Sequence, residues 1–153
     1  MPLKFSIITV TLNSEKTLAD SLNSVFRQKE AEVEHIIKDG GSNDETLRLA
    51  YEFEGNIRVI EQSDTGIYDA MNQGFDTATG EIVGFLNSDD FFSYDTALRD
   101  VADVFVREGV DIVYGDIEII KSDGTVVRRW RSGQLRNGRL RGQQLPHPAF
   151  FAR

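Results

Sequence analysis

Short apolar runs alternate with amphipathic segments along the first 107 residues, and this alternation constrains the fold more than any other feature of the chain. The apolar runs have the β-branched character of buried strands and cover residues 3–10, 33–38, 57–60 and 81–86. Apolar side chains at helical spacing follow each run, the last of them over residues 94–107. The pattern predicts an α/β fold with a mostly parallel central sheet flanked by helices.

The pattern changes in the last third of the chain. Residues 111–120 are expected to form one strand, and the Asp123-Gly124 pair predicts a β-hairpin near the C-terminus with residues 125–130 as its second strand. Residues 132–142 are expected to form a loop. Because 153 residues is the size of one domain, the whole chain is expected to form a single unit.

The charge is divided unevenly along the chain. Seven arginines and no acidic residue follow Asp123, so residues 1–123 carry −15 in a chain whose net charge is −8. A chain this acidic is a poor binder of nucleic acid, which is therefore not an expected partner. The basic stretch leaves three partners open: phosphates, an anionic membrane surface and the acidic part of the same chain.

The residue types limit the chemistry and the location. No cysteine is present, which excludes thiolate metal sites and cysteine nucleophiles and fits a reducing compartment. No run approaches the ~18 apolar residues of a transmembrane helix, and the N-terminal residues lack the apolar stretch of a signal peptide. We therefore expect a cytoplasmic protein.

Polar segments follow the first, second and fourth predicted strands, at residues 11–13, 39–42 and 87–90. The carboxyl ends of parallel strands meet at one edge of the sheet, and ligands of such sheets bind beyond that edge. The three segments are therefore expected to lie together and to form the binding site.

Two adjacent acids, Asp89 and Asp90, close the last of these segments after Asn87 and Ser88. A divalent cation would relieve their repulsion, and oxygen ligands suit Mg²⁺ or Mn²⁺. Such a cation can neutralise the charge of a departing phosphate. The alternative is a capping cluster in which one of the two acids starts the next turn.

The segment after the second strand begins with Asp39 and two glycines. An acidic side chain at such a site can accept hydrogen bonds from a base or a ribose, and glycine permits close approach of the backbone to a ligand. The alternative is an ordinary strand-to-helix turn with Ser42 or Asn43 as the N-cap. No Walker loop and no Gly-x-Gly-x-x-Gly fingerprint is present.

Three further residues have a functional and a structural interpretation. His147 lies between two prolines and is either a metal ligand or a partly buried structural residue. His35 lies inside a predicted strand, which favours a structural role. Trp130 and the arginines beside it form either an exposed hairpin edge or a surface for phosphates or a membrane.

Together, residues 5–13, 36–46, 64–74 and 78–90 resemble, in order, the motifs of the family 2 glycosyltransferases, with residues 146–151 as a weaker late match. These are bacterial inverting enzymes with the nucleotide-sugar-binding GT-A fold. The third segment is most similar to the branch that builds exopolysaccharide, capsule or O-antigen.

The resemblance implies how a nucleotide-sugar donor, most often a UDP-sugar, would be held. Thr11, Leu12 and Asn13 would line the nucleotide pocket, and Asp39 would hydrogen-bond the base. Asn72 would lie near the donor phosphates or the sugar. Leu12 occupies a position that is often aromatic in the family, so stacking on the base should be weaker.

The resemblance also implies a metal site. Asn87, Ser88 and Asp89 occupy the family's Asp-x-Asp position, with Asp89 as the ligand of Mn²⁺ or Mg²⁺ and Asp90 beside it. His147 is a third candidate ligand in the late match. The first acid of the motif is Asn87 here, so the contact to the donor sugar or ribose should differ.

By the same resemblance, residues 1–107 would be the nucleotide-sugar-binding half and residues 108–153 the start of an acceptor half. The acceptor would be a glycan or a lipid-linked glycan, at the inner face of the cell membrane. In this family an acidic residue deprotonates the acceptor. Because no carboxylate follows Asp123, we expect that base beyond residue 153, with Asp90 as the fallback, in a chain truncated at its acceptor half.

Two other functions stay open at this point. One is a module that binds a nucleotide-sugar without catalysing transfer. The other is a nucleotidyltransferase, which requires a loop rich in glycine and lysine after the first strand. Residues 11–15 do not supply such a loop.

Overall fold

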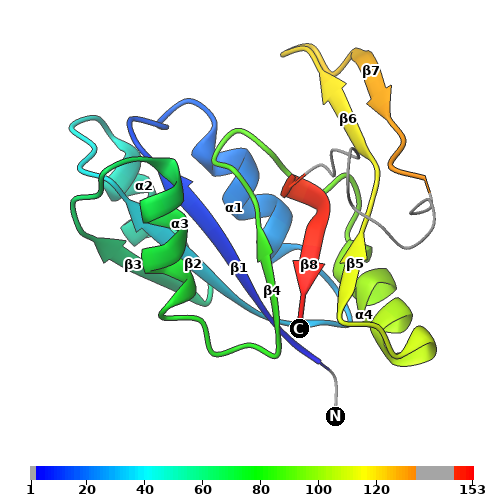
Figure 1. The fold of residues 1–153 in the computed structure, drawn as a ribbon. Helices are drawn as coiled ribbons and strands as arrows, with labels where there is room; N and C mark the ends of the chain where they lie inside the picture. Colours follow the sequence, from blue (N-terminus) through cyan, green and yellow to red (C-terminus); the bar gives the residue numbers. More distant parts are fainter. Residues whose placement is uncertain (1–2, 134–146) are drawn as a thin grey trace.

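The structure is a computed structural model that describes residues 3–133 and 147–153. A six-stranded sheet of order β3-β2-β1-β4-β8-β5 forms its centre (Figure 1). The strands of this sheet are β1 (Lys4–Thr11), β2 (Glu32–Asp39), β3 (Ile57–Glu61), β4 (Ile82–Phe85), β5 (Ile112–Tyr114) and β8 (Phe150–Ala152). Strands β1 to β4 are mutually parallel, which confirms the predicted α/β class with a mostly parallel sheet.

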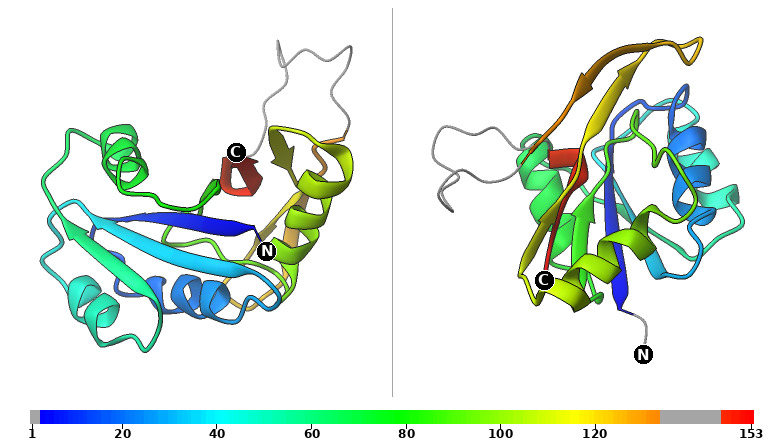
Figure 2. Two further views of the ribbon diagram at one scale, coloured as in Figure 1. Left: turned by 90° about the horizontal axis from the view of Figure 1, so that it is seen from below. Right: turned by 90° about the vertical axis from the view of Figure 1, so that its right-hand side faces the viewer.

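The helices lie on both faces of the sheet. They are α1 (Leu18–Phe26), α2 (Thr46–Glu52), α3 (Ile67–Phe75) and α4 (Ala97–Glu108). Figure 2 shows α1 and α2 on one face and α3 on the other. Gly74 allows α3 to approach β1 closely, since a Cβ atom there would lie 2.6 Å from Ile8 Cγ2.

The apolar core has two parts on the face covered by α1 and α2. The larger joins the middle of the sheet to α4 and is built by Phe5, Ile7, Val25, Ile82, Leu86, Leu98, Phe105 and Phe151. The smaller lies under α1 and α2 and is built by Leu18, Leu22, Ile37 and Ala50. Burial of these side chains supplies the main driving force for folding and fixes the sheet on which the polar edge is built.

The strand predicted over residues 111–120 is wrong, because two strands in different sheets replace it. Strand β5 ends at Tyr114, and the backbone N–H of Gly115 donates to the Ala149 carbonyl at 2.8 Å. The Ser132 backbone N–H then donates to Asp116 Oδ1 at 2.8 Å, which holds the chain as it leaves the main sheet. Polar contacts at these two residues therefore break the apolar run.

Beyond this break, β6 (Ile117–Ile120) pairs with β7 (Val126–Trp130) in a separate antiparallel sheet, which confirms the predicted hairpin. The gap between β4 and β5 is filled by β8, which runs antiparallel to both. The ring of Phe151 in β8 packs on Gly84. None of the helices among the described residues has the length and apolar character needed to cross a membrane.

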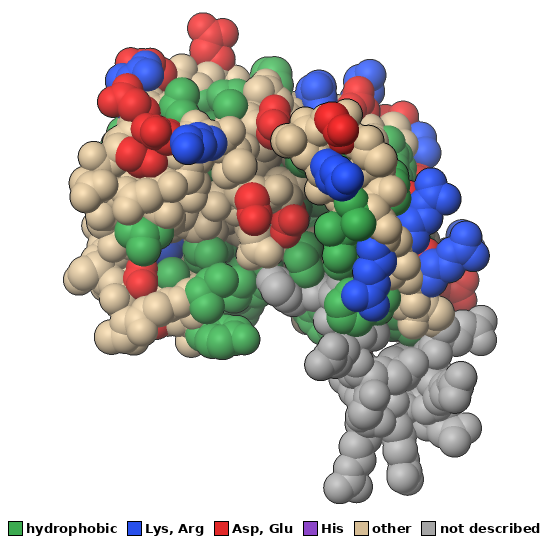
Figure 3. Space-filling view, turned by 90° about the horizontal axis from the view of Figure 1, so that it is seen from above, with side chains coloured by type: hydrophobic (Ala, Val, Ile, Leu, Met, Phe, Trp, Pro, Cys, Tyr) green, Lys and Arg blue, Asp and Glu red, His purple; other side chains and the backbone are tan. Residues whose placement is uncertain are grey.

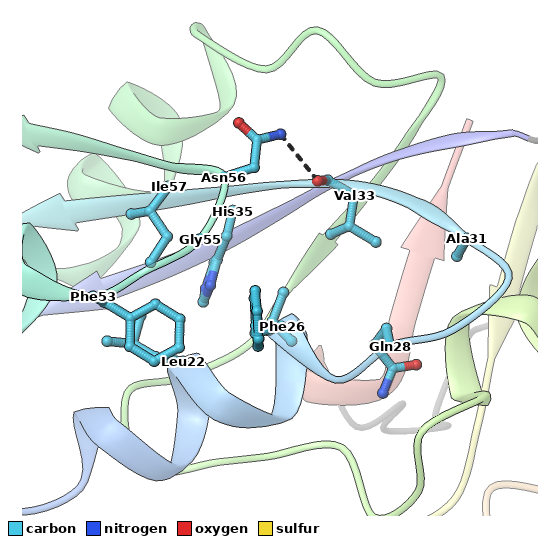
Figure 4. A pocket seen from close by; sticks show the side chains of 11 residues that line it. Leu22, Phe26, Gln28, Ala31, Val33, His35, Phe53, Gly55, Asn56 and Ile57 are labelled. Atoms are coloured by element: carbon cyan, nitrogen blue, oxygen red, sulfur yellow. Dashed lines mark hydrogen bonds between the residues drawn. The ribbon is translucent and has the colours of Figure 1, made fainter.

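A small cavity of about 210 Å³ lies between α1, β2 and the segment before β3 (Figure 4). His35 lines it but is 3% exposed, and its Nε2 lies 2.9 Å from Thr9 Oγ1. Burial lowers the pKa of His35 to about 3, so the folded chain holds a neutral imidazole. The structural role predicted for this histidine agrees with its position.

This burial predicts a loss of stability in mild acid. Because the folded pKa of His35 lies below its ordinary value, the unfolded chain takes up the proton first as the pH falls. The free energy of unfolding should drop by about 1.4 kcal/mol per pH unit below pH ~6.5. Urea unfolding at pH 7, 6 and 5 measures this slope, in a range where ordinary carboxylates stay ionised.

The matched variant is His35→Gln, which keeps a hydrogen-bonding group beside Thr9 and removes the titration. Its slope between pH 7 and 5 should be nearly flat, and His147→Gln reports the share of the other histidine. Equal slopes in the wild type and in His35→Gln would contradict the account.

Candidate functional site

The polar segments that follow β1, β2 and β4 meet at the carboxyl edge of the sheet, as the sequence predicts. Thr11 Oγ1 donates to Asp39 Oδ1 at 2.9 Å, which joins the ends of β1 and β2. The hydroxyl oxygens of Ser14 and Ser88 lie 2.8 Å apart, which joins the loops after β1 and β4. Figure 3 looks down on this edge and shows acidic side chains near its centre.

The loops after β1 and β2 are held together by reciprocal hydrogen bonds. The Asn13 backbone N–H donates to Ser42 Oγ at 2.8 Å, and the Asn43 backbone N–H donates to Asn13 Oδ1 at 2.9 Å. Further along, the Ser14 N–H donates to Thr46 Oγ1 at 2.7 Å. Asn13 has φ +51°, a left-handed conformation that asparagine adopts more readily than most residues. The two loops therefore form one rigid rim.

Asp39 lies at the centre of this rim and is only 1% exposed. Its Oδ2 accepts the backbone N–H groups of Gly41 at 2.8 Å and Ser42 at 2.7 Å, and its Oδ1 accepts the hydroxyls of Thr11 and Ser42. Burial alone would raise the pKa of Asp39, but these hydrogen bonds lower it below its ordinary value. Asp39 is therefore a charged acceptor that shapes the loop.

This arrangement also tests the alternative interpretation of the segment, in which Ser42 or Asn43 is the N-cap of the next helix. Ser42 Oγ donates to Asp39 at 2.5 Å and does not cap a helix. The helix α2 begins at Thr46 instead, and Asp44 Oδ1 accepts the Thr46 backbone N–H at 3.0 Å. The N-cap predicted at Ser42 or Asn43, the alternative interpretation of this segment, is wrong, because α2 begins only at Thr46, with Glu45 at the N-cap position.

Beneath the rim lies a buried ion pair between Lys38 and Asp64. Lys38 is fully buried, and its Nζ donates to Asp64 Oδ2 at 2.8 Å and to the carbonyls of Asp39 at 2.9 Å and Gln62 at 2.6 Å. Asp64 Oδ1 accepts the Gly66 backbone N–H at 3.1 Å. A Cβ atom at Gly40 would lie 2.7 Å from Asp64 Oδ2, so glycine is required there. The pair thus ties the ends of β2 and β3 together.

The acidic segment after β4 forms a tight turn. The Asp90 backbone N–H donates to the Asn87 carbonyl at 3.0 Å, and Asn87 Nδ2 donates to Asp90 Oδ2 at 2.8 Å. Ser88 is half-buried and Asp89 is exposed at the edge. The Asp90 carboxylate is thereby oriented by its own turn, and the Asp89 carboxylate remains accessible to a ligand.

These residues fit a divalent cation only if a bound molecule completes its coordination. Within residues 3–133 and 147–153, no group of three or more His, Cys, Asp or Glu side chains is placed to hold a metal. An exposed carboxylate at a strand edge is nevertheless the hard oxygen ligand that Mg²⁺ and Mn²⁺ take, together with substrate phosphates. A cation held here would therefore share its ligands between the protein and a bound molecule.

Three predicted site residues stand apart from this network. Leu12 is 62% exposed on the rim. Asn72 is exposed on α3, and no hydrogen bond within the described part of the chain joins its side chain to the rim. His147 begins the short 3₁₀ helix η2 (His147–Ala149), and its side chain lies outside the described residues.

Lys38 and Asp64 were not among the predicted site residues, although the sequence offers one signal for them. A lysine at the end of the apolar run Ile36-Ile37 is almost never buried without a partner. A buried Lys38 therefore predicts an acidic partner at the same sheet edge. Asp64, which follows the next strand, is that partner.

Comparison with known proteins adds independent findings. The family model for Glycosyl transferase family 2 matches residues 6–153. A PGL/p-HBAD biosynthesis glycosyltransferase of Mycobacterium bovis is 40% identical over 154 residues, which cover 97% of this chain and 59% of the relative. The chain therefore spans about three fifths of that relative's length.

Solved structures give the same picture. The crystal structure of S. aureus TarS 1-349 is 28% identical and superposes with a TM-score of 0.79 over 99% of this chain and 47% of TarS 1-349. Its complex with UDP-GlcNAc is 29% identical, with a TM-score of 0.72 over 80% of this chain and 37% of that one. A mannosyltransferase from Pyrobaculum calidifontis, solved with GDP-Man and Mn²⁺, is 20% identical with a TM-score of 0.68 over 78% of this chain and 36% of its own, a likeness of fold alone.

Proposed function

Because this chain belongs to glycosyl transferase family 2, we propose that its carboxyl edge binds a nucleotide-diphospho-sugar, with a UDP-sugar as the favoured donor. The observation that carries the proposal is the rim built around Asp39, where two loops converge on one buried carboxylate. The likeness to TarS, whose structure was solved with UDP-GlcNAc, supports the nucleotide.

In this proposal, different residues of the rim contact different parts of the donor. Thr11, Leu12 and Asn13 line the nucleotide pocket, and Asp39 accepts a hydrogen bond from the base. All four hydrogen bonds to Asp39 come from its own loops in this structure, so the base must displace one of them. The Ser42 hydroxyl is the one to turn away, because rotation about its χ1 releases the acceptor without moving the backbone.

The diphosphate and the sugar lie on the β4 side of the edge in this proposal. Asn72, Asn87 and Ser88 contact the sugar or the phosphates, and Asp89 holds Mn²⁺ or Mg²⁺ with Asp90 and His147 as further candidate ligands. When bound, the cation supplies charge neutralisation for the leaving diphosphate. The chain's own carboxylates orient it and give the edge its negative charge.

The reaction we propose is an inverting transfer to a glycan or a lipid-linked acceptor in cell-surface polysaccharide synthesis. The acceptor hydroxyl attacks the anomeric carbon opposite the diphosphate, so the new C–O bond forms as the old one breaks. The hydroxyl proton passes to a carboxylate. Among the described residues Asp90 is the fallback for this base, a role that competes with its role as a metal ligand. Residues 1–107 would bind the donor and residues 108–153 would begin the acceptor side.

Donor binding without turnover is the second candidate. Its support in the sequence is that residues 124–153 contain no Asp or Glu that could serve as a base. Incubation with UDP-sugars and Mn²⁺ separates the two functions. Release of UDP, by transfer or by hydrolysis of the donor, supports the transferase, and binding without any release supports the second candidate.

The metal proposal makes a specific prediction for Asp89→Ala. In the wild type, Mn²⁺ should tighten UDP binding about tenfold, which corresponds to about 1.4 kcal/mol, because a bound cation neutralises phosphate charge. In Asp89→Ala the addition of Mn²⁺ should leave the affinity for UDP unchanged. Calorimetric titration of UDP with and without Mn²⁺ measures both affinities.

The control is Asp103→Ala, which removes an exposed acid on α4. It should keep the full effect of Mn²⁺. An Asp89→Ala chain that still binds UDP more tightly in Mn²⁺ would remove Asp89 from the metal site.

A further inference from the structure

The proposed donor site does not use the β6–β7 hairpin. It is a two-stranded sheet of its own, and it projects past the carboxyl edge in Figures 1 and 2. An isolated two-stranded sheet is marginal in water. Its base is tied down by Ser132 Oγ, which donates to the Gly115 carbonyl at 2.6 Å, and by the Tyr114 hydroxyl, which donates to the Gly133 carbonyl at 3.0 Å.

The outer part of this hairpin exposes aliphatic side chains that a soluble hairpin would normally replace with polar ones. Four of them are 37–59% exposed, namely Ile119, Ile120, Val126 and Val127. Trp130 at the end of β7 is half-buried. The turn that joins the strands is polar, since residues 121–125 are Lys-Ser-Asp-Gly-Thr, and the exposed aliphatic side chains lie on the strands beside it, with the tryptophan nearer the body. Tryptophan is enriched where proteins meet the membrane interface, and apolar side chains insert there.

Basic side chains accompany the aliphatic ones. Arg128, Arg129 and Arg131 are all exposed, and Arg129 Nε donates to Glu118 Oε1 at 2.7 Å. Figure 3 shows basic side chains along the hairpin side of the molecule, away from the acidic centre of the edge. Residues 116–131 hold four basic and three acidic side chains, a net charge of +1 on a chain with net charge −8. An anionic surface therefore repels this segment less than the rest of the chain, and the exposed arginines at the end of the hairpin can contact it.

We propose that the β6–β7 hairpin docks this domain onto an anionic lipid bilayer, with the aliphatic side chains of its strands in the interfacial layer and its arginines on the lipid phosphates. Because the hairpin rises from the same end of the molecule as the carboxyl edge, docking turns the donor site toward the bilayer. This orientation is the one that a lipid-linked acceptor requires, and to that extent the inference rests on the proposed function.

Flotation with vesicles tests the docking directly. The full chain should float with vesicles of phosphatidylglycerol and phosphatidylcholine in equal amounts, and should not float with phosphatidylcholine alone. Replacement of two arginines in Arg128→Gln/Arg131→Gln should reduce partitioning about 30-fold, since each arginine near an anionic surface contributes about a factor of five. Ile119→Thr/Val127→Thr should weaken partitioning as well, and keeps β-branched residues in both strands.

The matched control is Arg27→Gln/Arg107→Gln, which removes the same charge from exposed positions outside the hairpin. It should float like the wild type. Equal loss in the control and the hairpin variant would overturn the proposal, as would failure of the wild type to float. Sedimentation velocity provides a further test. If the wild type is a dimer and both hairpin variants are monomers, the hairpin is a dimer interface and the docking proposal is overturned.

Calorimetric titration of UDP keeps this proposal distinct from the proposed function. Hairpin variants that lose flotation and retain the affinity for UDP support docking as a separate property. A wild-type chain that floats but does not bind UDP would contradict the proposed donor site and leave the docking proposal supported.

Discussion

Replacement of Lys38 by methionine is expected to lower the free energy of unfolding by about 3–5 kcal/mol. The substitution leaves the Asp64 carboxylate without its cation in a site where its side chain is 14% exposed. It also removes the donor to two backbone carbonyls, those of Asp39 and Gln62. Urea unfolding at pH 7 measures the loss of stability. Substitutions that break an exposed ion pair of this chain should cost much less.

The matched control is Lys29→Met, the same change in a pair where Lys29 Nζ lies 3.4 Å from Asp95 and both side chains are exposed. Such pairs contribute under about 1 kcal/mol. The double variant Lys38→Met/Asp64→Leu should recover part of the lost stability, because no buried charge is left unpaired. A Lys38→Met chain within about 1 kcal/mol of the wild type would show that the buried pair is not what holds the ends of β2 and β3.

Asp39→Ala is expected to weaken UDP binding at least about 100-fold, which corresponds to about 2.7 kcal/mol. The change removes the proposed contact to the base and the acceptor for four hydrogen bonds that shape the rim. Hydrogen bonds to a charged group contribute about 1.5–3 kcal/mol each, so an effect of this size is well within reach. Calorimetric titration of UDP measures it.

Two variants keep this result interpretable. Asp39→Asn preserves the size of the side chain but turns one acceptor oxygen into a donor, so it should also lose most of the affinity while far-UV circular dichroism shows a folded chain. Asp20→Ala removes an exposed acid on α1 and should bind UDP normally. Normal binding by a folded Asp39→Asn chain would contradict the role of Asp39 at the base.

The sheet and the edge could be predicted because their causes are local. Buried parallel strands need continuous apolar runs, and each run here is followed by a helix with one apolar face. The parallel order then brings Thr11, Asp39 and Ser88 together without any further information. The position of these site residues at one edge of the sheet was therefore predictable from the ends of the strands alone.

What could not be predicted depends on contacts between distant segments. Phe151 enters the sheet between β4 and β5, and nothing in its own neighbourhood says that a parallel sheet will accept an antiparallel strand there. The run over residues 111–120 is divided by contacts from Ala149 and Ser132, which lie far along the chain.

The rim around Asp39 is the proposed binding site of the nucleotide. The most direct measurement is titration of the ¹⁵N-labelled chain with UDP, followed by amide chemical shifts. The largest shifts are expected at Thr11, Asn13, Gly41 and Ser42, with saturation of the binding curve. Shifts confined to the cavity beside His35, or none at millimolar UDP with or without Mn²⁺, would contradict it.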